Sequence, residues 1–332
     1  MSKPKLALYW AAGCGGCDIA VLDIEEKILD VADFFDIVFW PCAMDFKYSD
    51  VEALGEKEID LTLFNGAIRT SENQYMAELL REKTKLLVAF GSCAMEGCIP
   101  ALSNFYDKQG TLDYAYRDAP SVDAESRGTY PQTHTAMPEG EIEIPEFFNT
   151  VKSLDQVVAV DYYIPGCPPQ SFQVLGVIEA VIDILKTGKP LPPKGAVLGA
   201  GEKTCCDECP RERKEKKIKQ FFRPHEIIPR EDICLLDQGI ICLGPATRSG
   251  CGALCVQANI PCRGCYGPPP QVQDQGAKMI AALSSVIDAT TPEETRKIME
   301  KIADPLGTFY RFSMAHSTFK RVQQEAAETV DA

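Results

Sequence analysis

The sequence predicts an α/β protein with a doubly wound parallel sheet in its first part and a smaller, cysteine-rich domain after it. Short apolar runs alternate with helix-like segments over the first 190 residues, as expected of strands that are buried on both faces. From about Leu191 the sequence PLPPKGAVLGAGEKT is rich in Pro and Gly, which indicates a domain boundary. We therefore expect one domain over 1–190 and a second over 191–332.

The elements follow from local patterns. Five apolar runs are expected as strands, at 6–10, 36–40, 59–65, 86–91 and 157–164. Apolar residues at helical spacing predict a helix over 19–29, and Ser71 is expected to cap a second one. Residues 101–150 are expected as a long insertion with little regular structure, of the kind that covers a site or meets a partner. Thr291, Pro292 and Glu294 have the pattern of a helix start in a C-terminal helical tail.

Composition and charge restrict the class of protein. The chain has 332 residues, of which 45% are hydrophobic, and no apolar run approaches the roughly 20 residues of a membrane span. The first residues lack the pattern of a signal peptide, so the expected location is the cytoplasm, where clustered cysteines indicate metal binding or catalysis. A net charge of −14 argues against nucleic acid as a partner. The basic run 211–219 is expected to be a solvated linker or helix face.

Twelve of the fifteen cysteines form three groups of four, and the first group is scattered along the sheet domain. Cys14 and Cys17 follow the first predicted strand, Cys93 follows the fourth, and Cys167 follows the fifth. In a doubly wound sheet, ligands bind outside the carboxyl ends of the strands. Loops from one sheet edge are therefore expected to bring these four thiols, the first tetrad, to one point.

The other two groups lie close together between positions 206 and 265. One contains Cys206, Cys209, Cys234 and Cys242, and the other contains Cys251, Cys255, Cys262 and Cys265. Short CxxC steps and a proline after a ligand are typical of iron–sulfur clusters, although four-thiolate zinc sites share this chemistry. The scattered first tetrad favours iron, since structural zinc is mostly held by compact knuckles. Cys205 is an alternative to Cys206, but only Cys206 makes the CxxC step to Cys209.

Other candidate residues have ordinary interpretations. Cys42 and Cys98 are expected to be small buried side chains, and no extra cysteine is expected near the first tetrad. Glu96 is expected to be a surface or interface carboxylate, with proton transfer as the alternative. The three histidines have no metal-ligand spacing. Gly13 and Gly15 begin a GxGxxG pattern, but Asp18 stands at its third glycine, so a dinucleotide site is not expected.

The motifs GCGGC, GSC and PGCPP, together with the block 206–265, closely resemble those of nickel–iron hydrogenase small subunits over nearly the whole chain. The resemblance implies a flavodoxin-like domain whose first tetrad holds a proximal 4Fe-4S cluster, beside the nickel–iron centre of a large subunit. It also implies medial and distal clusters in the second domain. The medial ligands would be Cys251, Cys255, Cys262 and Cys265, and the distal ligands Cys206, Cys209, Cys234 and Cys242. No residue of this chain would be catalytic.

Two positions indicate which subgroup of nickel–iron hydrogenases the chain resembles most. Cys206 replaces the histidine that begins the distal motif of the best-known uptake enzymes, and Cys255 offers a fourth medial ligand where those enzymes often have proline. The block is most similar to the gamma subunit of the methyl-viologen-reducing hydrogenase of methanogens, which does not use deazaflavin. This resemblance implies an iron–sulfur delta subunit and heterodisulfide reductase as partners. The small subunits of deazaflavin-reducing hydrogenases and of sulfhydrogenases are alternatives.

Two other functions fit parts of the pattern. A zinc-stabilised adaptor would explain the compact tetrads, but it gives no reason for three strand-end loops to carry thiols. A stand-alone ferredoxin-like carrier would explain the redox chemistry, but not a wide sheet edge that holds a cluster. Colour in the pure protein would separate iron from zinc, and a nickel-containing companion subunit would separate a hydrogenase from a carrier.

Overall fold

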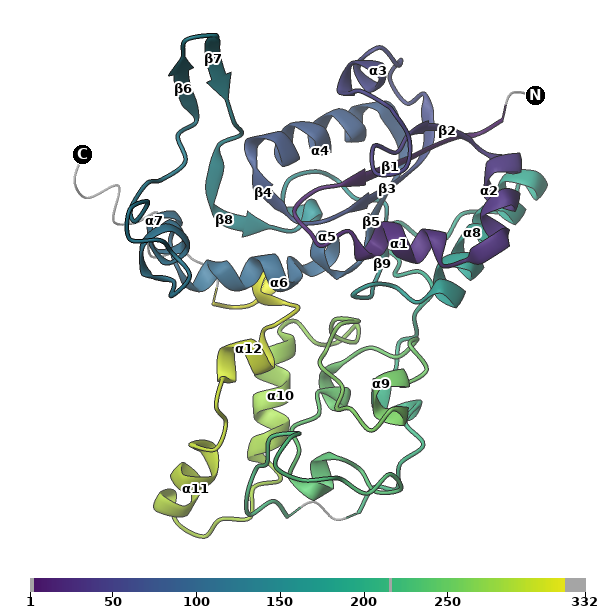
Figure 1. Cartoon of the computed structure of the whole chain (residues 1–332). Helices are drawn as coiled ribbons and strands as arrows, with labels where there is room; N and C mark the ends of the chain where they lie inside the picture. The colour runs from purple at the N-terminus through teal and green to yellow at the C-terminus, as the bar shows by residue number, and fades with distance from the viewer. Residues whose placement is uncertain (1–2, 215–216, 320–332) are drawn as a thin grey trace.

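A five-stranded parallel sheet forms the centre of the larger of two lobes in the computed structural model, which describes residues 3–214 and 217–319 (Figure 1). The strands are β1 (Lys5–Trp10), β2 (Asp36–Phe39), β3 (Ile59–Asn65), β5 (Thr84–Phe90) and β9 (Tyr162–Ile164). Their order is β2-β1-β3-β5-β9, so consecutive connections reverse direction beside β1. This order is that of a flavodoxin-like doubly wound sheet, and it confirms the predicted fold class.

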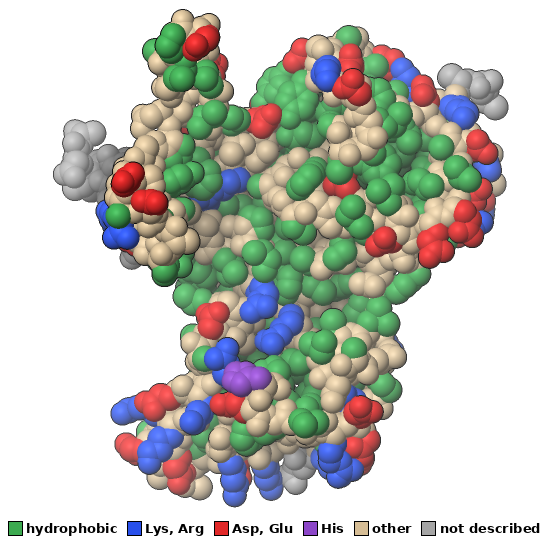
Figure 2. Space-filling model, viewed as in Figure 1, with side chains coloured by type: hydrophobic (Ala, Val, Ile, Leu, Met, Phe, Trp, Pro, Cys, Tyr) green, Lys and Arg blue, Asp and Glu red, His purple; other side chains and the backbone are tan. Residues whose placement is uncertain are grey.

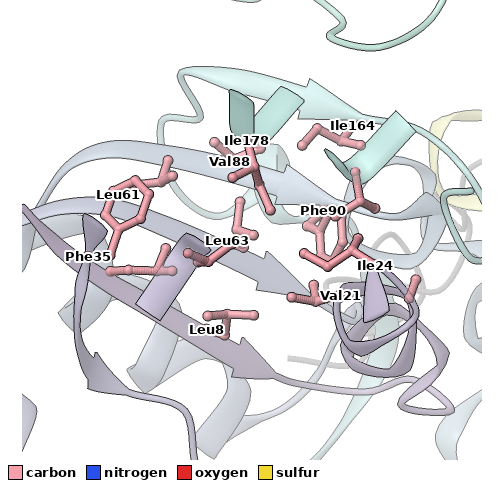
Figure 3. Packing of buried hydrophobic residues seen from close by; sticks show 14 of the residues in the cluster. Leu8, Val21, Ile24, Phe35, Leu61, Leu63, Val88, Phe90, Ile164 and Ile178 are labelled. Atoms are coloured by element: carbon pink, nitrogen blue, oxygen red, sulfur yellow. The ribbon is translucent and has the colours of Figure 1, made fainter. Parts of the chain in front are cut away.

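Alternate strand residues enter two cores, one on each face of the sheet. On one face Leu8, Leu63 and Phe90 pack with Val21 and Ile178 from helices that cover it (Figure 3). The opposite face buries a second apolar set, which includes Ala7, Phe64, Met76, Leu80 and Leu87. Burial on both faces explains why the strands read as continuous apolar runs in the sequence.

The helices of this lobe follow the strands. They are α1 (Gly16–Leu22), α2 (Ile28–Phe34), α3 (Tyr48–Glu52), α4 (Ser71–Lys83), α5 (Ser92–Glu96), α6 (Cys98–Ala101) and α8 (Ser171–Thr187). The single helix predicted over 19–29 is interrupted by a 3-10 turn, where Glu25 has a φ of 58°. The N-cap of α4 is Thr70, whose hydroxyl accepts a hydrogen bond from the backbone N–H of Asn73, so the capping prediction was wrong by one residue.

The insertion 101–150 contains more regular structure than its sequence predicts. It holds α7 (Lys108–Asp113), a π-helical turn (Tyr114–Asp118), the strands β6 (His134–Met137) and β7 (Gly140–Glu143), and the start of β8 (Phe147–Lys152). β8 pairs with β4 (Ile68–Thr70), while β6 and β7 form a hairpin that projects from the lobe (Figure 1). All residues of the two hairpin strands are exposed. The strands therefore lack the apolar alternation that would have predicted them.

The smaller lobe consists mostly of loops, with α9 (Leu254–Gln257), α10 (Gln275–Ser284), α11 (Pro292–Met299) and α12 (Pro305–Phe309). α11 begins as predicted, since the hydroxyl of Thr291 accepts a hydrogen bond from the N–H of Glu294 and Pro292 is the first helical residue. The last part of the predicted helical tail, 320–332, lies outside the described residues. Within the described ranges, no helix has both the length and the apolar character needed to cross a membrane.

One hydrophobic core joins the two lobes. Ala101 and Val151 of the larger lobe pack in the same cluster as Phe221, Met279 and Phe309 of the smaller one. The smaller lobe is thus packed against the larger lobe and is not connected to it by the Pro- and Gly-rich segment alone.

The described charged residues of the basic run 211–219 are exposed, as the sequence predicts, with the exception of Arg211. Arg211 is buried, and its guanidinium donates hydrogen bonds to the carbonyls of Arg230, Ile233 and Val256 and to the side chain of Asn259. Residues 215 and 216 of this run lie outside the described part of the chain. Arg211 therefore connects its own segment to the loop 230–233 and to α9 with the residue Asn259 that follows it.

Candidate metal centres

The first tetrad converges at the carboxyl edge of the sheet, as predicted. Cys14 and Cys17 lie at the start of α1 after β1, Cys93 lies in α5 after β5, and Cys167 follows β9. Burial raises the pKa of Cys17 well above its ordinary value, and the nearby thiols of Cys93, Cys167 and Cys14 raise it further. Four sulfurs that disfavour one another's charge are suited to a bound cation or metal cluster, which would relieve the repulsion. The donor set therefore fits an iron–sulfur cluster.

Glycine residues leave space for the sulfur atoms of the first tetrad. A Cβ at Gly91 would overlap with the sulfur of Cys17, and one at Gly16 would lie 3.4 Å from the sulfur of Cys14. Gly91 also has a φ of 84°, in the left-handed region that favours glycine. The β5 and β9 loops are joined directly, because the N–H of Ser92 donates to the carbonyl of Gly166 over 2.8 Å. The loop geometry is therefore built around the sulfur positions.

A fifth thiol lies against this tetrad. Cys98 is fully buried, and its sulfur is 3.7 Å from that of Cys167. Gly97, with a φ of 81°, turns the chain between α5 and α6 and so brings Cys98 back towards the site. The prediction that Cys98 is buried is confirmed, but the expectation of no additional cysteine beside the first tetrad was wrong. Cys42 is exposed, so its predicted burial was also wrong.

The structure brings Cys206, Cys209, Cys234 and Cys242 together. Burial raises the pKa of Cys206 to about 12, and Cys234 and Cys209 contribute to that shift. A Cβ at Gly244 would lie 2.9 Å from the sulfur of Cys206 and 3.8 Å from that of Cys242. Glycine at this position therefore leaves space for the sulfurs, as at the first tetrad.

The other C-terminal group also gathers in space. Burial raises the pKa of Cys265, and the neighbouring Cys262, Cys251 and Cys255 add to it. Cys205 is buried and hydrogen-bonds to Cys251 and Cys262, which lowers the pKa of Cys251 to about 7. The adjacent residues Cys205 and Cys206 thus face different tetrads, a division that the sequence alone left open.

The three tetrads are contiguous, with the 251–265 tetrad in the middle. On one side, the hydroxyl of Ser92, next to Cys93, donates to the carbonyl of Cys265, and Cys167 influences the pKa of Cys265. On the other side, the N–H of Cys262 lies 3.3 Å from the sulfur of Cys242. The thiol groups therefore form a row through the protein.

A buried polar network runs beside the junction of the first and middle tetrads. Glu96 is 5% exposed, and its carboxylate lies 3.8 Å from Nδ1 of His316. Nε2 of His316 contacts the carboxylate of Asp155 at 3.1 Å and the hydroxyl of Ser153 at 2.7 Å. Burial raises the pKa of Glu96 to about 7, while His316 opposes the shift. Glu96 is therefore an interior carboxylate, not the surface group that the sequence suggested.

Replacing Glu96 with Gln is expected to change how stability depends on pH. Between its unfolded value of 4.5 and about 7, the folded carboxyl keeps a proton that the unfolded chain releases, so the wild type loses stability as pH rises. Relative to wild type, Glu96→Gln should therefore gain about 3 kcal/mol between pH 4.5 and pH 8. Denaturant unfolding at several pH values measures this difference. If the free energy of unfolding depends on pH in the same way for the two proteins, the burial argument is contradicted.

This chain is similar to known proteins over most of its length. The family described as NADH ubiquinone oxidoreductase, 20 Kd subunit, matches residues 14–181. The iron-sulfur subunit of the F420-non-reducing hydrogenase of Archaeoglobus profundus is 42% identical, and the match covers 93% of this chain and 96% of that relative. A subunit of the F420-non-reducing hydrogenase of Methanothermobacter marburgensis is 37% identical, and the match covers 94% of each chain.

A solved structure shows the same fold. A chain of the [NiFeSe] hydrogenase from Desulfovibrio vulgaris Hildenborough matches 82% of this chain and 95% of its own, with a TM-score of 0.51 and 18% identity. The chain therefore belongs to the family of nickel–iron hydrogenase small subunits, and it is part of a hydrogenase. Within that family it is of the F420-non-reducing type, like its relatives from Archaeoglobus and Methanothermobacter.

Proposed function

We propose that this chain conducts electrons between a nickel–iron centre in the large subunit and an acceptor protein through three 4Fe-4S clusters. The proximal cluster would be held by Cys14, Cys17, Cys93 and Cys167, the medial by Cys251, Cys255, Cys262 and Cys265, and the distal by Cys206, Cys209, Cys234 and Cys242. The observation that carries this proposal is the contact of the middle tetrad with both others, through Cys265 on one side and Cys262 on the other. Separate structural sites would have no reason to lie in a row.

The chain's own residues provide burial, spacing and hydrogen bonds. When bound, such clusters take up and release single electrons at potentials set by hydrogen bonds to sulfur, charge and solvent exposure. The backbone amides of Gly15, Gly16 and Gly166 are candidates for such hydrogen bonds at the first tetrad. In the middle tetrad Cys262 is buried, Cys251 and Cys265 are half-buried and Cys255 is exposed, so solvent reaches this group on the side of Cys255.

The proposed acceptor is an iron–sulfur delta subunit that passes electrons to heterodisulfide reductase. Support for it comes from the Cys206 and Cys255 positions and from the similarity to subunits of F420-non-reducing hydrogenases. An acceptor of the deazaflavin-reducing or sulfhydrogenase type is the alternative, and electron transfer assays with each purified acceptor distinguish them.

Metal analysis of the anaerobically purified complex tests the proposal. About twelve irons and twelve acid-labile sulfides in this chain, with nickel in a companion subunit, are expected for three 4Fe-4S clusters. Zinc without sulfide would contradict the proposal and support the structural adaptor. Iron and sulfide without a nickel-containing companion would support a stand-alone carrier instead.

Serine substitutions at the adjacent cysteines separate the distal from the medial cluster. Cys206→Ser is expected to alter the EPR signal of the distal cluster, because Cys206 lies with Cys234 and Cys209. Cys205→Ser should leave all three clusters assembled and perturb only the medial signal, because Cys205 contacts Cys251 and Cys262. A distal signal lost in Cys205→Ser and kept in Cys206→Ser would reverse the assignment.

A further inference from the structure

A pocket with an excess of positive charge opens in the smaller lobe, between the segment 221–225 and the residues around α12. Its volume is about 360 Å³, and its charged lining is Arg223, His225, Arg263, Lys301, Arg311 and Asp304. Figure 2 shows Lys, Arg and His side chains gathered on this lobe, on the face in view. Such a concentration of cations stands out in a chain whose net charge is −14. We call it the cationic pocket.

Among the described residues, no salt bridge joins a cation of this pocket to an acidic side chain. Arg263 and Arg311 are both half-buried and line the same pocket. The one carboxylate in the lining, Asp304, caps α12 by accepting a hydrogen bond from the N–H of Gly307. Over 3–214 and 217–319, no salt bridge involves Arg263, Lys301 or Arg311. Two half-buried guanidinium groups that repel each other therefore favour an anion from outside the chain.

The walls of the pocket belong to the segments that carry the C-terminal tetrads. Ile240 and Ile241 lead directly into Cys242, and Arg263 lies between Cys262 and Cys265. If the proposed function holds, a group bound here would therefore lie beside the last two clusters of the row.

We infer that the cationic pocket docks an acidic segment of the protein that accepts the electrons. Arg side chains bind carboxylates through paired hydrogen bonds, and Arg and aromatic residues are enriched at protein interfaces. The exposed Arg223 and Lys301 form the rim, while Phe221 and Ile240 give an apolar floor. None of the described lining residues is a glycine, so the pocket lacks the flexible amide loop that usually cradles phosphate. This lining favours side-chain carboxylates over a nucleotide.

Charge reversal in the complex of this chain with the large subunit, purified without the proposed delta subunit that would fill the pocket, tests this inference. The probe is an acidic ferredoxin with two 4Fe-4S clusters. The assay measures the rate at which the complex reduces this ferredoxin with electrons from H2. Lys301→Glu and Arg311→Glu should each raise the KM for ferredoxin about tenfold with little change in kcat, since steering affects encounter more than chemistry. The wild-type KM should rise with ionic strength, and that dependence should weaken in both variants.

The control is Lys278→Glu, which makes the same charge change at an exposed position of the same lobe outside the pocket. Its KM should match that of the wild type. Equal KM values for all four proteins would overturn the inference, and so would a wild type that does not reduce ferredoxin at all. Iron content and cluster EPR signals of the same samples report separately on the proposed function. Intact clusters with an unchanged KM would therefore reject the pocket alone.

Discussion

Replacing Gly91 with alanine is expected to abolish the proposed proximal cluster and, with it, hydrogen-dependent dye reduction by the complex. The added methyl group would occupy the position of the Cys17 sulfur, and the φ of 84° is costly for alanine. The neighbouring N–H of Ser92 is fixed to Gly166, so the loop has little freedom to move away. Cys17 would therefore be displaced from the other three thiols. Iron content should fall by about four atoms for each chain.

Iron analysis, EPR and circular dichroism of the same samples check this result. Gly176→Ala is the matched control, because a Cβ at Gly176, within α8, meets nothing within 4 Å. That variant should keep its full iron content and gain slight helix stability. A Gly91→Ala protein with a normal proximal signal would show that Cys17 is not a ligand in this geometry.

Replacing Arg211 with methionine should destabilise the cysteine-rich lobe by about 3–5 kcal/mol, because it leaves buried carbonyl groups without a hydrogen-bond donor. The carbonyls of Arg230, Ile233 and Val256 would each lose a charged donor. The carbonyls of Arg230 and Ile233 lie in one loop and that of Val256 lies in α9, and the described part of the lobe has few helices and no extended sheet to hold these segments otherwise. The medial and distal clusters should consequently be lost on warming before the proximal cluster.

Thermal scans that follow each cluster signal measure the effect. Lys214→Met removes a positive charge from an exposed side chain of the same segment and should leave the transition within about 0.5 kcal/mol of wild type. If the two variants behave alike, the guanidinium of Arg211 does not hold the loops.

The sheet and the first tetrad were predictable because their signals are local. Strands buried on both faces appear as apolar runs, and Cys14, Cys93 and Cys167 each follow such a run, so sheet topology alone brings them together. The positions of Cys98 and Cys205 were not predictable. Each depends on a turn and on packing between segments distant in sequence, such as the reversal at Gly97.

Two further features could not be predicted from the sequence, for a related reason. Arg211 lies within a basic run that resembles a solvated linker, and only the folded loops show the carbonyls that it binds. The hairpin of β6 and β7 is exposed on both faces, so it carries no hydrophobic periodicity. Hydropathy patterns do not predict polar side chains that bind buried backbone groups. They also do not predict strands that project into solvent.

The core shared by the two lobes has a consequence for the timing of electron transfer. Ala101, Val151 and Phe309 pack together there, so the position of the first tetrad relative to the middle one is set by close packing. Electron tunnelling weakens steeply with the gap to be crossed, and a hinge between the lobes would make that gap fluctuate. In the proposed function, each electron transfer between the tetrads would then need no movement of one lobe relative to the other. Turnover would be governed by chemistry at the partner sites and not by motion of this chain.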